Sequence, residues 1–342
     1  MNPLEIVPII PQGGSVMPKS ILRSSWALAL LAGLLAPGIA TAQASGTPTG
    51  SLHDGVVVDA ASGAAYVMSR QGGIDALDLT TGNVLWQSRD AAKPLLVQGG
   101  TLVAQAAPSQ HGKLAVVALD AKRGTVKQRV DVELPAAVRA HVFDGPSQAF
   151  RVQAFSTADN AVAVVWTAEE GRSFQGIMPE PEGAPAKSAV SAAAQPLRGA
   201  ARLDLGAGRA VPMAYEKAMS QKDSAIEAKS LKDVNPRQLT SLDGRHVLNS
   251  ERLPDGKLWA QYRWTVTDAD GATVGTIEAP VSMAPFVVSG SRILYVAQPS
   301  VRREGNKMVE EPLRLRALDL QTGAEMWTAL VTDSAYRGPF PP

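Results

Sequence analysis

Two segments of the chain, residues 74–86 and 315–327, have very similar sequences: IDALDLTTGNVLW and LRALDLQTGAEMW. They share A-L-D-L, T-G and a closing Trp. A match of this length within one chain indicates a repeated structural unit. Alternating apolar residues predict a strand, Asp and Thr-Gly predict a tight turn, and the residues up to the Trp predict a second strand. The sequence therefore predicts an all-β protein built from repeats.

Fainter copies of the turn lie between the two strong ones. Their glycines are Gly124, Gly171, Gly208 and Gly271, which follow Gly82 and precede Gly323. The spacing of about 40 to 60 residues is typical of one four-stranded blade of a β-propeller. We expect six blades, with five or seven as the alternatives, because the rhythm fails between residues 172 and 240. The first and last blades are expected to be neighbours, and a strand from near residue 50 is expected to complete the final blade.

The repeated residues have structural explanations. Asp at the end of the first strand can accept backbone N–H groups in the turn, Gly takes the left-handed position, and Trp wedges between neighbouring blades. Repetition favours this framework role over acid catalysis or ligand stacking, and the same holds for Asp204. The predicted structural residues are Asp78, Gly82, Trp86, Asp120, Gly124, Asp319, Gly323 and Trp327.

The pattern of a strand, a turn, Y-V-x-S and then A-L-D-x-x-T-G-x-x-x-W resembles the repeat of the pyrroloquinoline-quinone (PQQ) type β-propellers. The resemblance is strongest over 55–88 and 285–331. That family includes quinoprotein dehydrogenases. It also includes propellers that bind no quinone, such as the lipoprotein subunit of the outer-membrane β-barrel assembly machinery. The resemblance implies the fold and leaves both functional classes open.

No catalytic constellation stands out. A quinoprotein dehydrogenase has a calcium-type site, a catalytic Asp and usually a vicinal Cys pair, and this chain has no Cys. The four histidines lack metal-ligand spacing, and D-A-D-G at 268–271 lacks the later ligands of a calcium loop, which favours a hairpin turn. We predict no catalytic residue, no metal site and no cofactor, neither PQQ nor calcium. The expected function is non-enzymatic binding or scaffolding in the cell envelope; the alternative is a quinone- or metal-assisted oxidoreductase with a divergent site.

The N-terminus predicts export. Residues 17–42 read as a signal peptide with a positive start, an apolar stretch and a small-residue cleavage site at Ala42/Gln43. Residues 1–16 fit no signal, so translation is expected to start at Met17. The mature chain, 43–342, is expected to form one propeller domain in the periplasm or outside the cell, without a stable membrane anchor.

The predicted partner is a protein or another envelope component. A net charge of +1 gives no basic excess for nucleic acid. Residues 176–237 are expected to interrupt the repeat, with a loop at 178–194 and a short surface helix within 213–232 whose apolar residues are too sparse for a buried face. A recognition surface and a tolerated insertion are both open interpretations of this region.

Overall fold

Antiparallel strand meanders dominate the computed structural model. It describes residues 50–106, 113–143, 149–157, 159, 161–169, 197–227, 238–254, 261–297, 301–304, 307–310 and 313–332. All of them belong to one compact unit, Ser45–Pro342, and the unit Met1–Ala44 lies outside the described residues. The expected signal peptide, its cleavage site, the start at Met17, the loop at 178–194 and the tail at 335–342 also fall outside them.

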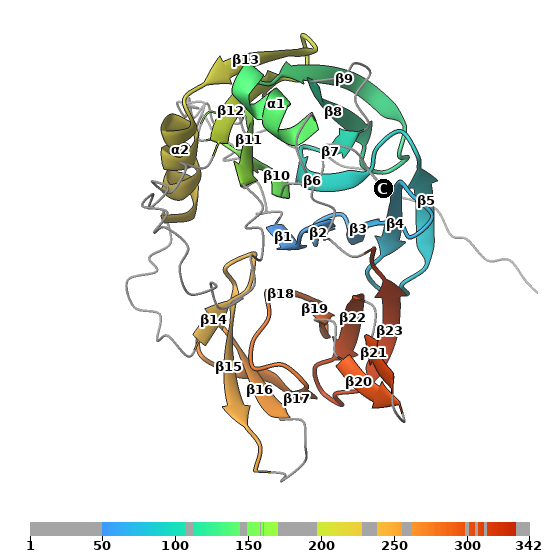
Figure 1. The fold of residues 1–342 in the computed structure, drawn as a ribbon. Coiled ribbons are helices and arrows are strands. Elements are labelled where there is room, and N and C mark those ends of the chain that lie inside the picture. Colours follow the sequence, from blue (N-terminus) through green and yellow to red (C-terminus); the bar gives the residue numbers. More distant parts are fainter. Residues whose placement is uncertain are drawn as a thin grey trace, which may run out of the picture. The chain divides into compact units, whose positions relative to one another are not determined.

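The described residues form five sheets of four or five strands, each with its strands in chain order, and one two-stranded sheet (Figure 1). Sheet A contains β1 (Gly50–His53), β2 (Val56–Asp59), β3 (Ala64–Met68), β4 (Ile74–Asp78) and β5 (Val84–Ser88). Sheet B contains β6 (Lys93–Gln98), β7 (Thr101–Ala106), β8 (Lys113–Asp120) and β9 (Val126–Glu133). Sheet C contains β10 (Ala149–Ser156), β11 (Val162–Glu169), β12 (Leu197–Asp204) and β13 (Arg209–Met213).

Sheets D and E complete the set. Sheet D contains β14 (Gln238–Thr240), β15 (His246–Arg252), β16 (Tyr262–Asp268) and β17 (Thr273–Ala279). Sheet E contains β18 (Phe286–Ser289), β19 (Arg292–Ala297), β22 (Arg314–Asp319) and β23 (Glu325–Leu330). The hairpin of β20 (Val301–Glu304) and β21 (Lys307–Glu310) connects β19 to β22. Two helices are α1 (Ala136–Phe143) and α2 (Tyr215–Glu227), and no helix of the described residues is long and apolar enough to cross a membrane.

The expected all-β propeller architecture of four-stranded blades is confirmed. In sheets A, B and E burial falls from the first strands to the last one, as the Val-rich runs predict: every residue of β2 and β3 is buried, whereas most of β5 and β23 is exposed or half-buried. Strands that are apolar on both faces pack between two neighbouring sheets. The last strand of each sheet keeps one free edge.

Shared hydrophobic clusters join the sheets in the order D–E–A–B–C. The first and last sheets are therefore neighbours, as expected: Leu315 and Ala317 of sheet E pack with Val58 and Val67 of sheet A. The backbone N–H of Thr332 also donates to the Met68 carbonyl, 3.1 Å away. Within the described residues, no such cluster joins sheet C to sheet D.

The N-terminal strand differs from its expected place. Strand β1 pairs with β2, with Gly50 opposite Val58, and so extends the first sheet instead of completing the last. The connection is Asp54-Gly55, and Gly55 has a φ of 80°. An Asp-Gly pair favours the tight two-residue hairpin turn, and this local hairpin forms in place of the long-range pairing.

The described blades number five, the lower end of the expected range rather than six. The extra blade came from counting Gly171 and Gly208 separately. Both follow strands of sheet C: residue 171 lies beyond β11, outside the described residues, and Gly208 lies in the turn between β12 and β13. One blade with a long connection between its second and third strands thus looks like two in the sequence.

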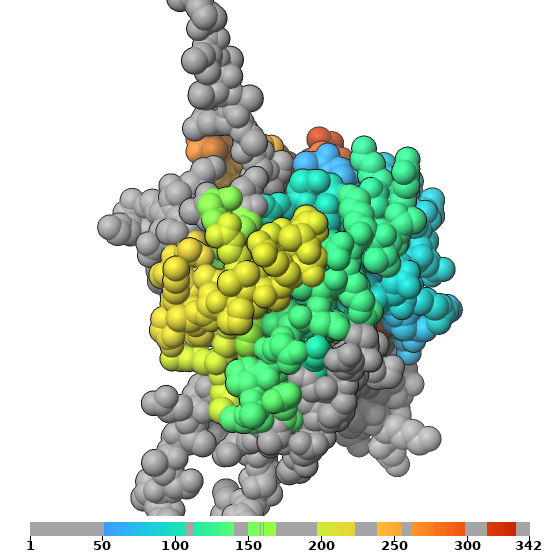
Figure 2. Space-filling model, turned by 90° about the horizontal axis from the view of Figure 1, so that it is seen from above, coloured from blue at the N-terminus to red at the C-terminus, as the bar shows by residue number. Residues whose placement is uncertain are grey.

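The region expected to interrupt the repeat contains part of a blade. Residues 197–213 form β12 and β13 of sheet C. Helix α2 follows at Tyr215, and Figure 2 shows it beside β13 on one face of the molecule. Its Ala218 is fully buried, and Met219 is packed against a cluster that contains Phe155 and Val165 of sheet C. The expectation of a helix without a buried face was wrong, because small and flexible side chains suffice to cover this sheet face.

Candidate functional site

The aspartates of the strong repeats are held inside their own turns. Oδ1 of Asp78 accepts the backbone N–H groups of Thr80 (2.9 Å) and Thr81 (2.7 Å) and the Thr81 hydroxyl (3.0 Å). Asp319 repeats this pattern, with the backbone N–H and hydroxyl of Thr322 at 2.8 and 2.9 Å. One carboxylate oxygen of each Asp is therefore occupied by turn donors, as expected for a structural role in the turn.

These donors lower the pKa of each turn carboxyl. The backbone N–H of Thr81 is the main cause at Asp78, and that of Thr322 is the main cause at Asp319. At Asp120 the ammonium of Lys127 contributes most, because it forms an ion pair with Oδ2 at 3.2 Å. Hydrogen bonds to the charged form favour that form, so these carboxyls hold their charge to lower pH in the folded chain than in the unfolded chain.

Acid is therefore expected to weaken the fold through these turns. A carboxyl whose folded pKa lies below its unfolded value, about 3.9 for Asp, stabilises the fold above that value. That contribution is lost as the pH falls through the lower folded pKa. Urea unfolding of the parent and of Asp319→Asn between pH 5 and pH 2 measures this. The variant should lose less stability over that interval, and equal losses would show that the turn carboxyl does not titrate with unfolding.

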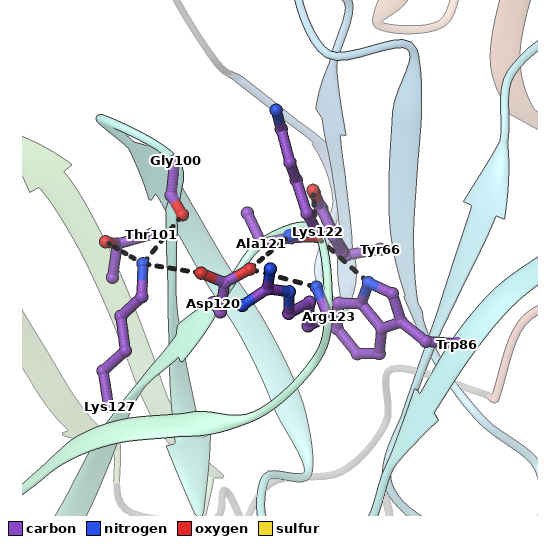
Figure 3. A network of polar contacts seen from close by, with 9 residues as sticks. All are labelled: Tyr66, Trp86, Gly100, Thr101, Asp120, Ala121, Lys122, Arg123 and Lys127. Carbon is purple, nitrogen blue, oxygen red and sulfur yellow. Dashed lines mark hydrogen bonds and ion pairs between the residues drawn. The ribbon is translucent and has the colours of Figure 1, made fainter.

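The Trp of sheet A contacts the turn of sheet B (Figure 3). The Trp86 indole N–H donates to the Ala121 carbonyl at 3.0 Å, and the Tyr66 hydroxyl donates to the same oxygen at 3.1 Å. The two rings lie 5.7 Å apart. A Cβ on Gly124 (φ 70°) would overlap the indole ring, so only Gly allows this approach.

The same contact joins the last sheet to the first. The Trp327 indole N–H donates to the carbonyl of Leu79 at 3.1 Å, across a sequence separation of 248 residues. A Cβ on Gly82 (φ 73°) would lie 2.7 Å from the Trp327 ring. Each strong repeat thus gives its Trp to the next blade: Trp86 packs on Gly124, and Trp327 packs on Gly82.

The other three sheets have different residues at the Trp position, which lies four residues after the turn Gly. The sequence analysis did not predict these residues. In sheet B this position is Gln128, whose amide lies against Gly208 of sheet C. In sheet D it is Gly275, whose backbone lies directly against Leu320 of sheet E. In sheet C it is Pro212, which is exposed. The fixed offset from each turn Gly is the sequence signal that identifies all three.

A Ser–Asp–His cluster closes the hairpin between β14 and β15. The Ser241 hydroxyl donates to Asp243 Oδ1 at 2.5 Å and accepts the backbone N–H of His246 at 3.0 Å. His246 Nδ1 lies 4.0 Å from the same carboxylate oxygen. A catalytic triad needs the hydroxyl bonded to the imidazole, and here the hydroxyl proton is bonded to the carboxylate. The cluster shapes a turn.

The remaining candidate ligands lie apart. Among the described residues, no three His, Asp or Glu side chains gather as a metal site. His53 is in β1 and His246 is in β15; the side chains of His111 and His141 fall outside the described residues. Asp268 accepts the backbone N–H groups of Asp270 (3.0 Å) and Ala272 (2.9 Å), which makes the D-A-D-G segment a hairpin turn.

Neither a family profile nor a curated protein sequence matches the chain. Solved structures that resemble it include BamB from Moraxella catarrhalis (13% identity, 78% of this chain and 58% of that chain, TM-score 0.25). A quinohemoprotein alcohol dehydrogenase from Pseudomonas putida matches at 11% identity (78% and 57%, TM-score 0.22). The β-propeller domain of Cps50 (Swd1) from Myceliophteria thermophila matches at 12% (83% and 88%, TM-score 0.28). The chain spans less than two thirds of the first two, and likeness this slight does not bear on function.

Proposed function

We propose that this chain is a non-enzymatic binding or scaffold protein of the cell envelope, exported to the periplasm or beyond. Its partner is a protein segment that pairs with an exposed sheet edge. Export is supported by the signal-like residues 17–42. Binding is supported by one observation, the composition and exposure of the free edge of sheet A.

Strand β5 is the outermost strand of sheet A, and it reads VLWQS. Val84 is 52% exposed and Leu85 is 53% exposed, the highest values among the large apolar side chains described. Free strand edges are usually protected by charge or proline, because their unpaired N–H and C=O groups invite another strand. The other outermost strands have such protection: β9 carries four charged residues, β13 carries Arg209 and Pro212, and β17 and β23 each carry a Glu.

The chemistry of this edge selects its occupant. Unpaired backbone groups bind an extended polypeptide by adding a strand to the sheet. The exposed Val84 and Leu85 side chains would contact apolar residues on that strand. A segment of β-forming apolar residues from an envelope protein is therefore the expected ligand.

Leu85→Lys is expected to abolish this binding, because it places a charge on the edge. Met326→Lys is the matched control, since Met326 precedes Trp327 as Leu85 precedes Trp86 and is 43% exposed. A photo-crosslinking residue at position 85 should give one defined adduct from envelope extract. The adduct partner, once purified, should protect the β5 amides from hydrogen exchange in the parent and in Met326→Lys, but not in Leu85→Lys. An adduct without β5 protection would refute strand addition.

Export has its own test. Cell fractionation of the native host should find the chain in the periplasm or medium, with an N-terminus at Gln43 by mass spectrometry. A chain that keeps residues 17–42 and stays in the cytoplasm would contradict the proposed location.

A further inference from the structure

Three polar side chains lie together where the first strands of sheets A and B meet, and a fourth, Arg151, comes from the neighbouring first strand of sheet C. Lys93 begins β6 and Gln105 lies directly opposite it on β7. Asp54 lies in the turn between β1 and β2, and its Oδ1 is 3.4 Å from the Lys93 ammonium. Arg151 lies on β10, whose residues contact β6, and its charge acts on Lys93.

The two side chains from sheet B are buried with donors to spare. Lys93 is 4% exposed and Gln105 is 1% exposed. The Gln105 Nε2 has no hydrogen-bond partner among the described residues. The ammonium has three N–H donors and, among the described residues, one ion pair, whose 3.4 Å is longer than the roughly 2.7–2.9 Å of a well-formed bond between charged groups. A buried donor without an acceptor is costly to the fold, so both groups favour an added acceptor.

The net charge of the cluster also favours an anion. Burial lowers the pKa of Lys93, the nearby Asp54 opposes that effect, and the positive charge of Arg151 adds to it. Two positive charges, those of Lys93 and Arg151, thus interact here, and the one ion pair described between these groups is that of Lys93 with Asp54. An anion placed between Lys93 and Arg151 would relieve their repulsion.

We propose that Lys93, Gln105 and Arg151 form a binding site for a small carboxylate, with Asp54 as the competing internal carboxylate. Directly opposed residues on antiparallel strands have Cβ atoms about 4.5–5.5 Å apart, so the ammonium and the amide offer neighbouring donors to the two oxygens of one carboxylate. Asp54, with 38% of its side chain exposed, and the exposed Arg151 form the solvent side of the site. The site is separate from the β5 edge and does not depend on the function proposed above.

Calorimetric titration of the full chain with succinate tests the site. The parent should bind saturably, and Arg151→Gln should weaken binding about tenfold, the effect of one lost charge contact. Asp54→Asn should strengthen binding, because it removes the competitor and leaves an Asn-Gly turn. The control is Arg209→Gln, an arginine 70% exposed and paired with Asp204 at 3.5 Å, which should bind as the parent does. Lys93→Met should abolish binding. If Lys93→Met does not fold, the results for Arg151→Gln and Asp54→Asn decide whether the site exists.

Further arms identify the source of the carboxylate. Trialanine binding without binding of its C-terminal amide points to a polypeptide carboxylate, and succinate binding alone points to a free organic acid; both results support the site. Binding of inorganic phosphate without succinate would overturn the carboxylate assignment. Three results would overturn the site: no saturable binding of succinate, the same loss of affinity in Arg209→Gln as in Arg151→Gln, or weaker binding by Asp54→Asn. If Lys93 and Asp54 form only a structural ion pair, no saturable binding is expected.

Discussion

Replacing Trp327 with alanine is expected to lower the free energy of unfolding by about 3–5 kcal/mol. The indole packs on Gly82 and donates to the Leu79 carbonyl, so its loss leaves a gap and an unpaired acceptor between the last and first sheets. Because the ring is half-buried, the lower end of that interval is expected. Chemical denaturation, monitored by far-ultraviolet circular dichroism and not by tryptophan fluorescence, measures the effect.

The position of the contact also predicts where the fold opens. Trp327 joins residues 248 apart in sequence, so its loss should speed amide exchange in both sheet A and sheet E. Met326→Ala is the control, because that exposed neighbour makes no such contact and surface substitutions usually change stability by less than about 0.5 kcal/mol. If Trp327→Ala and Met326→Ala unfold at the same denaturant concentration, the indole does not hold the two sheets together.

The parts of the fold that the sequence predicts are those set by local chemistry. The A-L-D-x-x-T-G turn needs only an Asp acceptor, nearby backbone donors and a Gly at positive φ, and all three lie within five residues. The apolar runs of β2, β3 and β19 identify buried strands for the same local reason. The fold class follows from the repetition of these units.

The missed features depend on contacts between distant residues. Gln128 and Gly275 occupy the position of Trp in the strong repeats, but neither residue type resembles Trp in the sequence. The two strong repeats also share a Tyr-Val pair, but Tyr66 and Tyr295 pack against different neighbouring sheets. Tyr66 pairs with Ala76, whereas Ala317, the equivalent of Ala76, pairs with Leu294, so Tyr295 faces the opposite neighbour. A one-residue shift reverses the face of a strand residue, and only the sheet register shows it.

The sequence does not predict the cluster around Lys93, for a related reason. Its members come from a turn of sheet A, two strands of sheet B and one strand of sheet C. Each alone reads as an ordinary surface charge or amide at the edge of a strand. Their meeting depends on the packing of three sheets, which no spacing within the chain encodes.

The junction between sheets D and E shows how a blade without the repeat Trp is held. Gly275 brings the last strand of sheet D directly against the Leu320 backbone, and the aromatic side chain comes instead from Trp264 on β16. Trp264 is fully buried, lies 4.9 Å from the Tyr295 ring and donates its indole N–H to the Val281 carbonyl at 2.9 Å.

Trp264→Ala is therefore expected to cost about 3–5 kcal/mol of unfolding free energy, toward the upper end because the ring is fully buried. The cavity would adjoin the Tyr295 ring, and the Arg316 guanidinium opposite Tyr295 on the neighbouring strand is already bonded to Glu325 at 2.7 Å. The surrounding groups thus have little means of compensation. Chemical denaturation of Trp264→Ala beside Trp327→Ala measures the order of the two effects.

Trp264→Phe separates packing from hydrogen bonding at this site. It keeps an aromatic ring against Tyr295 and removes the indole N–H, so it should cost less than Trp264→Ala by about 1–3 kcal/mol. If Trp264→Phe is as unstable as Trp264→Ala, the bond to Val281 matters more than the buried ring. If Trp264→Ala costs less than Trp327→Ala, sheet D is held to sheet E mainly by the close backbone approach at Gly275, and Gly275→Ala would then be the more damaging substitution at this junction.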